Sequence, residues 1–240
     1  MIYSRISSTT DKKFALLIDP ENYDQQSLSR IIKTANNSRI DFILVGGSIL
    51  SQSIDKTVEF IKNLTHIPVI LFPGNLLQVS DKADGILLLS LISGRNPELL
   101  IGNHVLAAKM LKNSNLEIIP TGYILVNGGN VTSVEYISNT KPIPANKTEI
   151  IVSTAIAGQL LGQKAIYLEA GSGANNSPST NVIQQVKNHI EIPLIVGGGL
   201  KTPRDIELAC KAGADMVVVG NIIENDPERL KSLVDTVKHL

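Results

Sequence analysis

The sequence predicts a single (β/α)8 barrel, an α/β fold of the TIM-barrel type, modified around its third crossover. Three observations favour it. Short apolar runs alternate with amphipathic stretches along all 240 residues, as in strands joined by helices into a parallel sheet. The runs number eight, which is the strand count of such a barrel, and the chain has a usual barrel length. No linker or composition shift interrupts the pattern, so we expect one domain over residues 1–240.

The predicted strands are continuous apolar runs rather than alternating ones, so both faces of each strand should be buried. Pro120 and Gly122 fall within the fifth run and leave its extent open. In chain order the predicted strands are Phe14–Ile18, Phe42–Val45, Val69–Phe72, Gly85–Leu89, Ile118–Val126, Ala165–Glu169, Leu194–Val196 and Met216–Val219.

Helix signals lie between the strands. Asp24, Thr202-Pro203 and Asp226-Pro227 each predict a helix start, and Gly213 predicts the end of the helix that follows Thr202. The third crossover differs, because Gly74–Lys82 is too short for a full helix. The expected buried stripes are Leu28, Ile31, Ile32 and Ala35; Ile54, Val58 and Ile61; Ile206, Ala209 and Cys210; and Leu230, Leu233, Val234 and Val237.

Composition narrows the class of protein. The 22 basic and 22 acidic side chains give a net charge of zero, without the basic excess typical of a nucleic-acid binder. With Cys210 as the single cysteine, an intramolecular disulfide and a cysteine-cluster zinc site are excluded. No signal-peptide pattern is present, and no apolar run approaches the roughly 20 residues of a transmembrane segment. We therefore expect a cytoplasmic globular protein.

Glycine-rich turns follow the last two strands. Gly197-Gly198-Gly199 comes directly after the seventh, and Gly220-Asn221 comes directly after the eighth. Glycines there allow backbone amides to approach an anion, and barrels often bind phosphate after these two strands. A single glycine pair would favour a simple tight turn. Two of them at the expected strand ends favour a phosphate site.

The sixth strand carries a second candidate site, Tyr167-Leu168-Glu169-Ala170-Gly171-Ser172-Gly173. Tyr167 and Glu169 are two residues apart and so share one face of the strand. We predict both as catalytic residues, because a carboxylate at a strand end can accept a proton or hold a hydroxyl. The Gly-Ser-Gly turn that follows is another potential anion cradle.

Oxygen-bearing side chains follow the first two strands. Asp19 and Ser48 would be neighbours at the barrel rim, and such a pair suits Mg²⁺, which binds few protein ligands together with substrate phosphates. Taken alone, Asp19-Pro20 fits a turn as well as a metal ligand. Arg95, after the fourth strand, could clamp a phosphate or lie on the surface ahead of a helix.

These motifs together resemble those of the geranylgeranylglyceryl phosphate synthase family. The similarity covers essentially the whole chain in the right order, and Tyr-Leu-Glu-Ala-Gly-Ser-Gly is its most specific motif. The matching segments are Phe14–Glu21, Gly46-Gly47-Ser48, Arg95-Asn96-Pro97, Pro120–Val126, Tyr167–Gly173, Ile195–Gly199 and Gly220-Asn221.

The resemblance implies a prenyltransferase that joins a polyprenyl diphosphate, foremost geranylgeranyl diphosphate, to the 3-hydroxyl of sn-glycerol 1-phosphate, yielding an ether-lipid precursor and diphosphate. By position, Asp19 and Ser48 would bind Mg²⁺, and Glu169 would orient or deprotonate the hydroxyl. The glycerol phosphate would contact Tyr167, Leu168, Glu169, Ala170, Gly171, Ser172, Gly173, Gly198, Gly199, Gly220 and Asn221. The resemblance also implies a homo-oligomer, and the prenyl tail suggests transient contact with a membrane surface.

The chain departs from some bacterial relatives at Leu17, where they carry a phosphate-binding lysine. Phosphate binding would then rest on the glycine turns. Leu99, Leu100 and Ile101 could line a groove for the prenyl tail or form ordinary helix core. Two other functions remain open: a phosphate-binding barrel isomerase or lyase, although no lysine ends a strand, and a non-catalytic barrel that binds a phospho-ligand.

Overall fold

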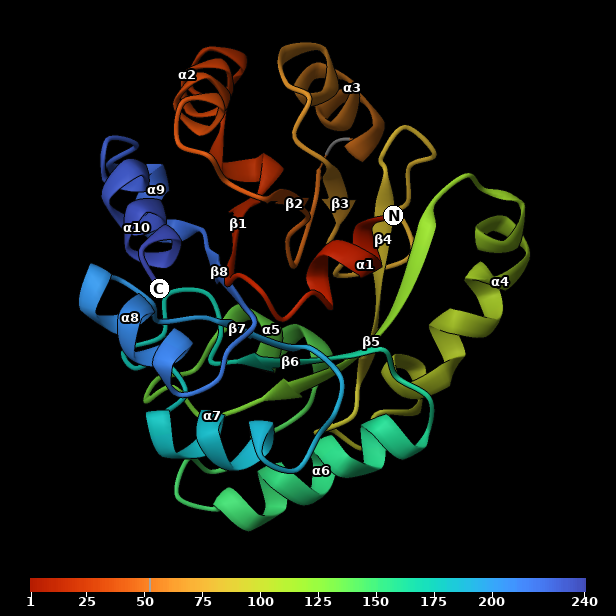
Figure 1. Cartoon of the computed structure of the whole chain (residues 1–240). Helices are drawn as coiled ribbons and strands as arrows, with labels where there is room; N and C mark the ends of the chain where they lie inside the picture. The colour runs from red at the N-terminus through yellow and green to blue at the C-terminus, as the bar shows by residue number, and fades with distance from the viewer. Residues whose placement is uncertain (52) are drawn as a thin grey trace.

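The computed structural model describes residues 1–51 and 53–240, which form a closed barrel of eight parallel strands in sequential order (Figure 1). Pairing of β8 with β1, from Lys13↔Met216 to Leu16↔Val219, closes the barrel. The predicted fold class is therefore confirmed, and the single domain over residues 1–240 stays a prediction. The strands are β1 (Lys13–Ile18), β2 (Phe42–Val45), β3 (Val69–Leu71), β4 (Gly85–Leu91), β5 (Glu117–Leu125), β6 (Ala165–Glu169), β7 (Leu194–Gly197) and β8 (Met216–Val219).

Strand residues divide into two buried layers because successive side chains point to opposite faces. One layer fills the barrel interior, and the other lies between the strands and the surrounding helices. In β6, for example, Tyr167 points inward and Leu168 points outward. Residues of the interior layer include Ala15, Phe42, Leu44, Ile70, Leu87, Tyr123, Tyr167, Ile195 and Met216.

Helices surround the strands in Figure 1 and bury the predicted stripes of α2, α3, α8 and α10. Asp24 and Thr202 cap α2 and α8 as expected, but α10 begins at Arg229 rather than next to Asp226, because Pro227 and Glu228 form a preceding turn. The helices are α1 (Ile2–Ile6), α2 (Gln25–Asn36), α3 (Ile54–Leu64), α4 (Asn103–Asn113), α5 (Ser133–Ser138), α6 (Thr148–Leu160), α7 (Thr180–Lys187), α8 (Pro203–Lys211), α9 (Asn221–Asn225) and α10 (Arg229–Lys238), with a 3₁₀ turn η1 (Pro20–Asn22) and a π-helical turn η2 (Glu98–Gly102).

Helix α1 closes the barrel at the amino ends of the strands. Its Ile2 and Ile6 side chains are buried with the interior layer. The first residue of β5, Glu117, accepts a hydrogen bond from the backbone N–H of Tyr3 at 2.8 Å, which holds the start of the helix. We did not predict α1, because five residues are too few to show a helical period.

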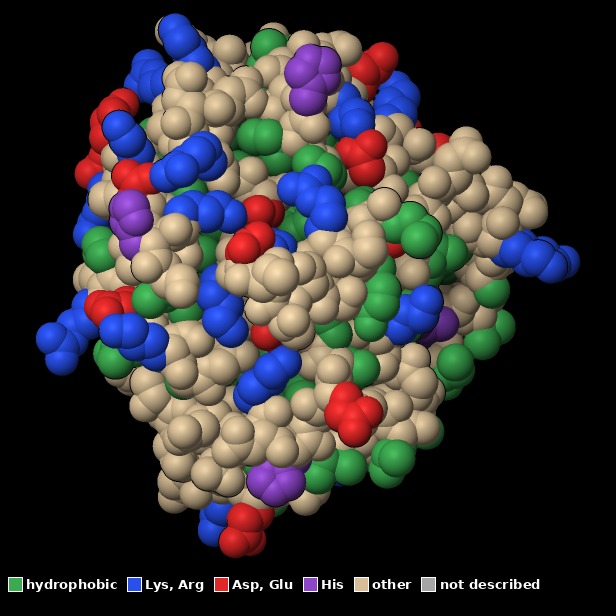
Figure 2. Space-filling view, viewed as in Figure 1, with side chains coloured by type: hydrophobic (Ala, Val, Ile, Leu, Met, Phe, Trp, Pro, Cys, Tyr) green, Lys and Arg blue, Asp and Glu red, His purple; other side chains and the backbone are tan. Residues whose placement is uncertain are grey.

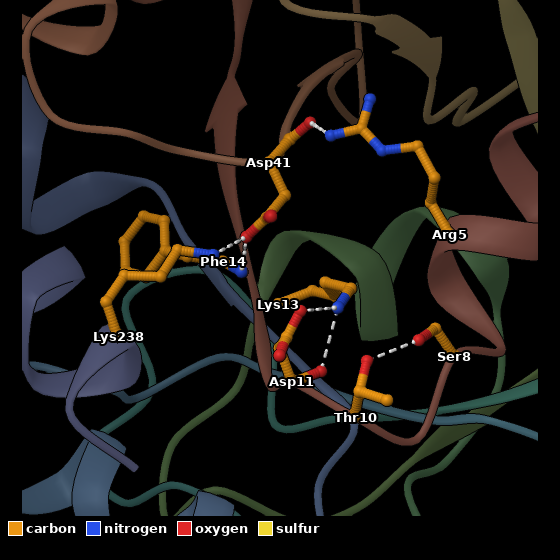
Figure 3. Close-up of polar contacts among 8 residues, drawn as sticks. All are labelled: Arg5, Ser8, Thr10, Asp11, Lys13, Phe14, Asp41 and Lys238. Carbon is orange, nitrogen blue, oxygen red and sulfur yellow. Dashed lines mark hydrogen bonds and ion pairs between the residues drawn. The ribbon is translucent and has the colours of Figure 1, made fainter.

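Three aspartates stabilise the same end of the barrel in one repeated arrangement. Asp41, directly before β2, accepts hydrogen bonds from the Phe14 backbone N–H of β1 at 2.8 Å and from the Lys238 ammonium of α10 at 2.7 Å (Figure 3). Asp84, before β4, accepts hydrogen bonds from the backbone N–H of Val69 and the ammonium of Lys62. Asp215, before β8, accepts hydrogen bonds from the backbone N–H of Leu194 and the ammonium of Lys187. Each carboxylate thus connects a strand start, the preceding strand and a helix.

The third crossover, between β3 and β4, contains no helix in residues 72–84, all of which the structure describes. This confirms the expected modification of the barrel. Gln78 holds the segment in place: its buried amide accepts hydrogen bonds from the backbone N–H groups of Gly47 and Gly74 and donates one to the carbonyl of Gly47 at 2.6 Å. The side chain of Gln78 therefore ties the crossover to the loop after β2.

Candidate active site

A cavity of about 710 Å³ lies at the carboxyl ends of the strands. This is the end of a barrel where enzymes of this architecture place their catalytic groups. The side chains and turns predicted as site residues after β1, β2, β6, β7 and β8 meet around it. Those that line the cavity are Asp19, Ser48, Tyr167, Glu169, Ser172, Gly173, Gly198, Gly199, Gly220 and Asn221.

Glu169 is a buried carboxylate in the cavity wall, 5% exposed. Burial raises its pKa from 4.5 to about 7, even though a hydrogen bond from the Gly171 backbone N–H at 2.6 Å opposes the shift. A carboxylate with this pKa is partly ionised at neutral pH and can take a proton from a bound hydroxyl. Its position is set by Gly198, where a Cβ atom would come within 2.1 Å of the Glu169 Oε1.

Tyr167 lies one inward position before Glu169 and is fully buried. Its ring stacks on Tyr123, with centroids 5.4 Å apart, and also contacts Phe72. Burial and the negative charge of Glu169 raise the pKa of the Tyr167 hydroxyl well above its usual range, so it stays protonated. The hydroxyl lies close enough to lower the pKa of Glu169, yet it forms no well-aligned hydrogen bond among the described residues. It is available as a donor at the cavity wall.

Backbone amides of the glycine turns are available to an anion. Within residues 1–51 and 53–240, the N–H groups of Gly173, Gly198 and Gly199 donate to no protein acceptor. Gly198 and Gly199 have φ values of +76° and +71°, a conformation that strongly favours glycine. A hydrogen bond of 2.8 Å from the Ser172 hydroxyl to the Asn221 side chain connects the turn after β6 to the residue after β8. The three turns therefore face one cavity.

Asp19 and Ser48 approach the cavity from the ends of β1 and β2, and β1 is the direct neighbour of β8. The Asp19 carboxylate packs against Gly47, where a Cβ atom would lie 2.4 Å from its Oδ2, and Gly47 is held from the other side by Gln78. Burial raises the pKa of Asp19, and burial together with the Asp19 charge raises that of Glu224, which also lines the cavity. This repulsion between carboxylates makes the rim a suitable place for a divalent cation.

The donor set fits Mg²⁺ rather than a metal that needs a protein cage. Among the described residues, no three His, Cys, Asp or Glu side chains gather as ligands. Mg²⁺ keeps several waters and takes one or two carboxylates beside substrate phosphates. Asp19 and Ser48, with Glu224 nearby, meet that requirement.

The cavity continues from the barrel mouth into an apolar groove. The groove passes between the third crossover, β4 and α4, in the layer that a helix of the third crossover would otherwise fill. Leu99 lines the cavity as predicted, whereas Leu100 does not and Ile101 is 61% exposed. Residues that line the groove include Leu76, Val79, Ile86, Leu88, Ala107 and Leu111.

Besides Leu100 and Ile101, four predicted or considered residues do not line the cavity. Leu168 packs outward against the helices because it alternates with Tyr167 and Glu169 along β6, so its side chain cannot contact a ligand there. The amides of Ala170 and Gly171 are used within the protein, by the carbonyl of Gly197 and the carboxylate of Glu169. Arg95 is exposed and donates to the carbonyl of its neighbour Gly94 at 2.7 Å, so it does not lie at the cavity as a phosphate clamp.

Sequence reasoning missed two residues that shape the site. Gln78 acts through a long-range contact with Gly47, and nothing in its apolar surroundings in the sequence indicates this partner. Glu224 lies in α9, close in sequence to the predicted Gly220-Asn221 turn. This closeness was a signal in the sequence that Glu224 could reach the same cavity. The fold brings Glu224 to Asn22, whose amide donates to it at 3.0 Å.

The fold and the cavity define a class: a (β/α)8-barrel enzyme whose site combines a buried carboxylate, the backbone amides of glycine turns and an apolar groove. The model of the PcrB family matches residues 7–238. The chain belongs to this family of geranylgeranylglyceryl phosphate synthases and is a prenyltransferase of that type.

Individual relatives agree with this assignment. The chain is 46% identical to geranylgeranylglyceryl phosphate synthase of Chitinophaga pinensis, over 94% of this chain and 90% of that protein. It is 49% identical to the protein of that name in Zunongwangia profunda, over 92% and 94%. The crystal structure of (S)-3-O-geranylgeranylglyceryl phosphate synthase from Thermoplasma acidophilum, in complex with sn-glycerol-1-phosphate, superposes with a TM-score of 0.92 at 36% identity, covering 100% of this chain and 97% of that one.

Proposed function

We propose that the chain joins geranylgeranyl diphosphate to the 3-hydroxyl of sn-glycerol 1-phosphate with the help of Mg²⁺. The observation that carries this proposal is the cavity itself, at the head of an apolar groove. In it Glu169, with a pKa of about 7, faces glycine amides that have no acceptor in the part of the chain that the structure describes. The amides suit a phosphate, the carboxylate suits a hydroxyl, and the groove suits a prenyl tail. Two findings support the choice of substrates: relatives are named geranylgeranylglyceryl phosphate synthase, and the structure of one of them contains sn-glycerol-1-phosphate.

In the reaction, the 3-hydroxyl oxygen forms a bond to C1 of the prenyl chain while the bond from C1 to the diphosphate oxygen breaks. The electron pair of that bond leaves with diphosphate, and the hydroxyl proton passes to Glu169. Amides of Gly173, Gly198 and Gly199 would hold the phosphate of the acceptor and fix the hydroxyl near the carboxylate. Tyr167 would donate a hydrogen bond to the attacking oxygen or to Glu169.

Asp19 and Ser48 would bind Mg²⁺ at the ends of β1 and β2. The cation would neutralise charge on the departing diphosphate. Because Asp19 is positioned by Gly47, and Gly47 by Gln78, the structure supports a fixed metal ligand rather than a mobile surface carboxylate.

The apolar groove would hold the prenyl tail and keep water from the developing allylic cation. Its lining fits a hydrocarbon, since Leu76, Val79 and Leu88 contribute no polar side-chain atom. We infer that the enzyme works in the cytoplasm, in transient contact with the membrane surface that holds the prenyl substrate. Among the described residues, no helix has the length and apolar character needed to cross a bilayer.

The test is direct turnover. Purified protein is incubated with Mg²⁺, sn-glycerol 1-phosphate and prenyl diphosphates of several lengths, and the ether product and diphosphate are measured. We expect product with geranylgeranyl diphosphate, and none when sn-glycerol 3-phosphate replaces the acceptor. No product at any prenyl length would refute the proposal. A barrel isomerase or lyase would leave prenyl diphosphate unused, and a non-catalytic binder would bind glycerol phosphate without consuming it.

A further inference from the structure

The cavity is strongly unbalanced in charge. Asp19, Glu98, Glu169 and Glu224 line it, whereas Lys201 is the one lysine or arginine among the described residues of its wall, which also includes His104. Both substrates of the proposed function are anions. Amides and a divalent cation balance only part of that charge, so a full positive charge at the wall has a specific role to fill.

The backbone of Lys201 is fixed directly beside the glycine cradle. Lys201 follows Gly198-Gly199-Leu200, and its N–H donates to the Asp205 carboxylate at 3.1 Å. The same carboxylate accepts the N–H of Thr202 in the capping box of α8. The side chain therefore starts from a rigid point at the edge of the cradle.

The ammonium of Lys201 lacks an acidic partner. It donates to the backbone carbonyl of Asn175 at 3.3 Å, across the turn after β6, and forms no ion pair within residues 1–51 and 53–240. Lys62, Lys187 and Lys238, in contrast, each lie within 2.7 Å of a carboxylate oxygen. The bond to the Asn175 carbonyl keeps the ammonium at the cavity wall, and a long bond to a neutral carbonyl is easily exchanged for a stronger one to a phosphate oxygen.

We propose that Lys201 binds the phosphate of the acceptor substrate and supplies the positive charge that the glycine amides lack. This rests on the proposed function and extends its phosphate site by a residue. Lys201 lies beside Gly198 and Gly199 after β7, whereas Asp19 and Ser48 follow β1 and β2, so its partner is the glycerol phosphate rather than the diphosphate. On binding, the ammonium exchanges the Asn175 carbonyl for a phosphate oxygen.

The test measures binding of sn-glycerol 1-phosphate by titration calorimetry without Mg²⁺ or prenyl diphosphate. We expect K201M to weaken the affinity about tenfold, and K201R to stay within about threefold of wild type. K201Q keeps a hydrogen-bond donor but no charge, and it should behave like K201M. K211M, which removes an exposed lysine paired with Glu207, is the matched control and should bind as wild type does.

Steady-state kinetics show which of the two anionic substrates Lys201 binds. K201M should raise the KM for glycerol phosphate about tenfold and leave kcat and the KM for prenyl diphosphate unchanged. Normal affinity in K201M or K201Q would overturn the inference, and so would a loss confined to the prenyl diphosphate KM. If wild-type protein bound no glycerol phosphate at all, the proposed function itself would fail, which is a different result. A more steeply salt-dependent affinity in wild type than in K201M would support the role of charge.

Discussion

At the scale of single residues, Glu169 combines burial with one strong backbone hydrogen bond, and the balance sets its pKa at about 7. If it is the general base, kcat/KM should rise with pH and level off above about 7. Glu169→Gln keeps the shape but cannot take the proton, so kcat should fall about 10²- to 10⁴-fold with little change in glycerol phosphate affinity. A pH–rate profile and a binding titration check this. A loss of affinity alone would make Glu169 a binding residue.

Glu169 should also lower the stability of the fold at alkaline pH. Its folded pKa, about 7, lies above the ordinary value of 4.5, so the folded state favours the protonated form. The contribution is fully present below 4.5 and is lost as pH rises through 7. The shift corresponds to about 3 kcal/mol at most. In urea unfolding, Glu169→Gln should therefore be more stable than wild type at pH 8 but not at pH 4. Equal stability at both pH values would contradict the shift.

Asp19 is the residue on which the metal assignment depends. Asp19→Asn retains the volume and the contact with Gly47 but removes the charge, so Mg²⁺-dependent turnover should disappear while the fold and glycerol phosphate binding persist. Binding of Mn²⁺, followed by electron paramagnetic resonance, should weaken in parallel. Asp55→Asn on α3, outside the cavity lining, is the control. Normal metal binding in Asp19→Asn would show that the ligand is elsewhere.

At the scale of elements, the aspartates before β2, β4 and β8 make the amino end of the barrel a stabilising frame. Asp41 is 13% exposed, so Asp41→Ala leaves the Lys238 ammonium and the Phe14 N–H without their partner in a poorly hydrated place. We expect a loss of about 2–3 kcal/mol in the free energy of unfolding. Glu207→Ala, which removes an exposed pair on α8, should cost under about 0.5 kcal/mol. If urea unfolding gave similar losses of stability in the two variants, the aspartates would not have the stabilising role proposed for them.

The strands were predictable because parallel strands that are buried on both faces have continuous apolar runs in the sequence. β2, β6 and β8 have the predicted bounds, and the stripes of α2 and α8 follow helical spacing. Elements without such a local signal were missed, as with α1, whose burial depends on the open end of a barrel formed by distant strands. The aspartate that recurs directly before three strands was a visible pattern, but its partners lie up to 197 residues away.

The same distinction holds for the candidate site. Residues at strand ends, such as Asp19 and Glu169, could be placed because the fold class dictates where carboxyl ends meet. Leu168 was included with its motif, although strand alternation already placed it on the other face. Gln78 and Lys201 could not be assigned from the sequence, because their roles depend on contacts with Gly47 and Asn175 in other loops.

At the scale of the whole molecule, charges of both signs are interspersed over the face shown in Figure 2, and hydrophobic side chains gather along its lower right edge, where Figure 1 has α4 and α6. Val105 and Leu106 on α4 are 66% and 71% exposed, and Leu160 at the end of α6 is 80% exposed. Apolar surface of this kind is typical of an interface. We propose that a second copy of the chain covers it, in keeping with the expected homo-oligomer.

Light scattering coupled to size-exclusion chromatography should therefore give a mass of at least twice 25.8 kDa at micromolar concentration. Leu106→Glu should shift the protein toward the monomer, because a charge would be buried at the contact. Lys33→Glu on the exposed face of α2 should not. A wild-type monomer that sediments with lipid vesicles would mean that this surface meets a membrane instead.

The helix-free crossover between β3 and β4 has one more consequence. In a barrel with a complete ring of helices, a ligand must fit within the internal space above the strands. Here the cavity extends past Leu76 and Leu88 toward α4, so an elongated ligand can lie across the wall, with its head at the axis and its tail outside the strands. We therefore expect lining residues of α4, among them Ala107 and Leu111, to limit the length of tail that is accepted more than the width of the barrel does.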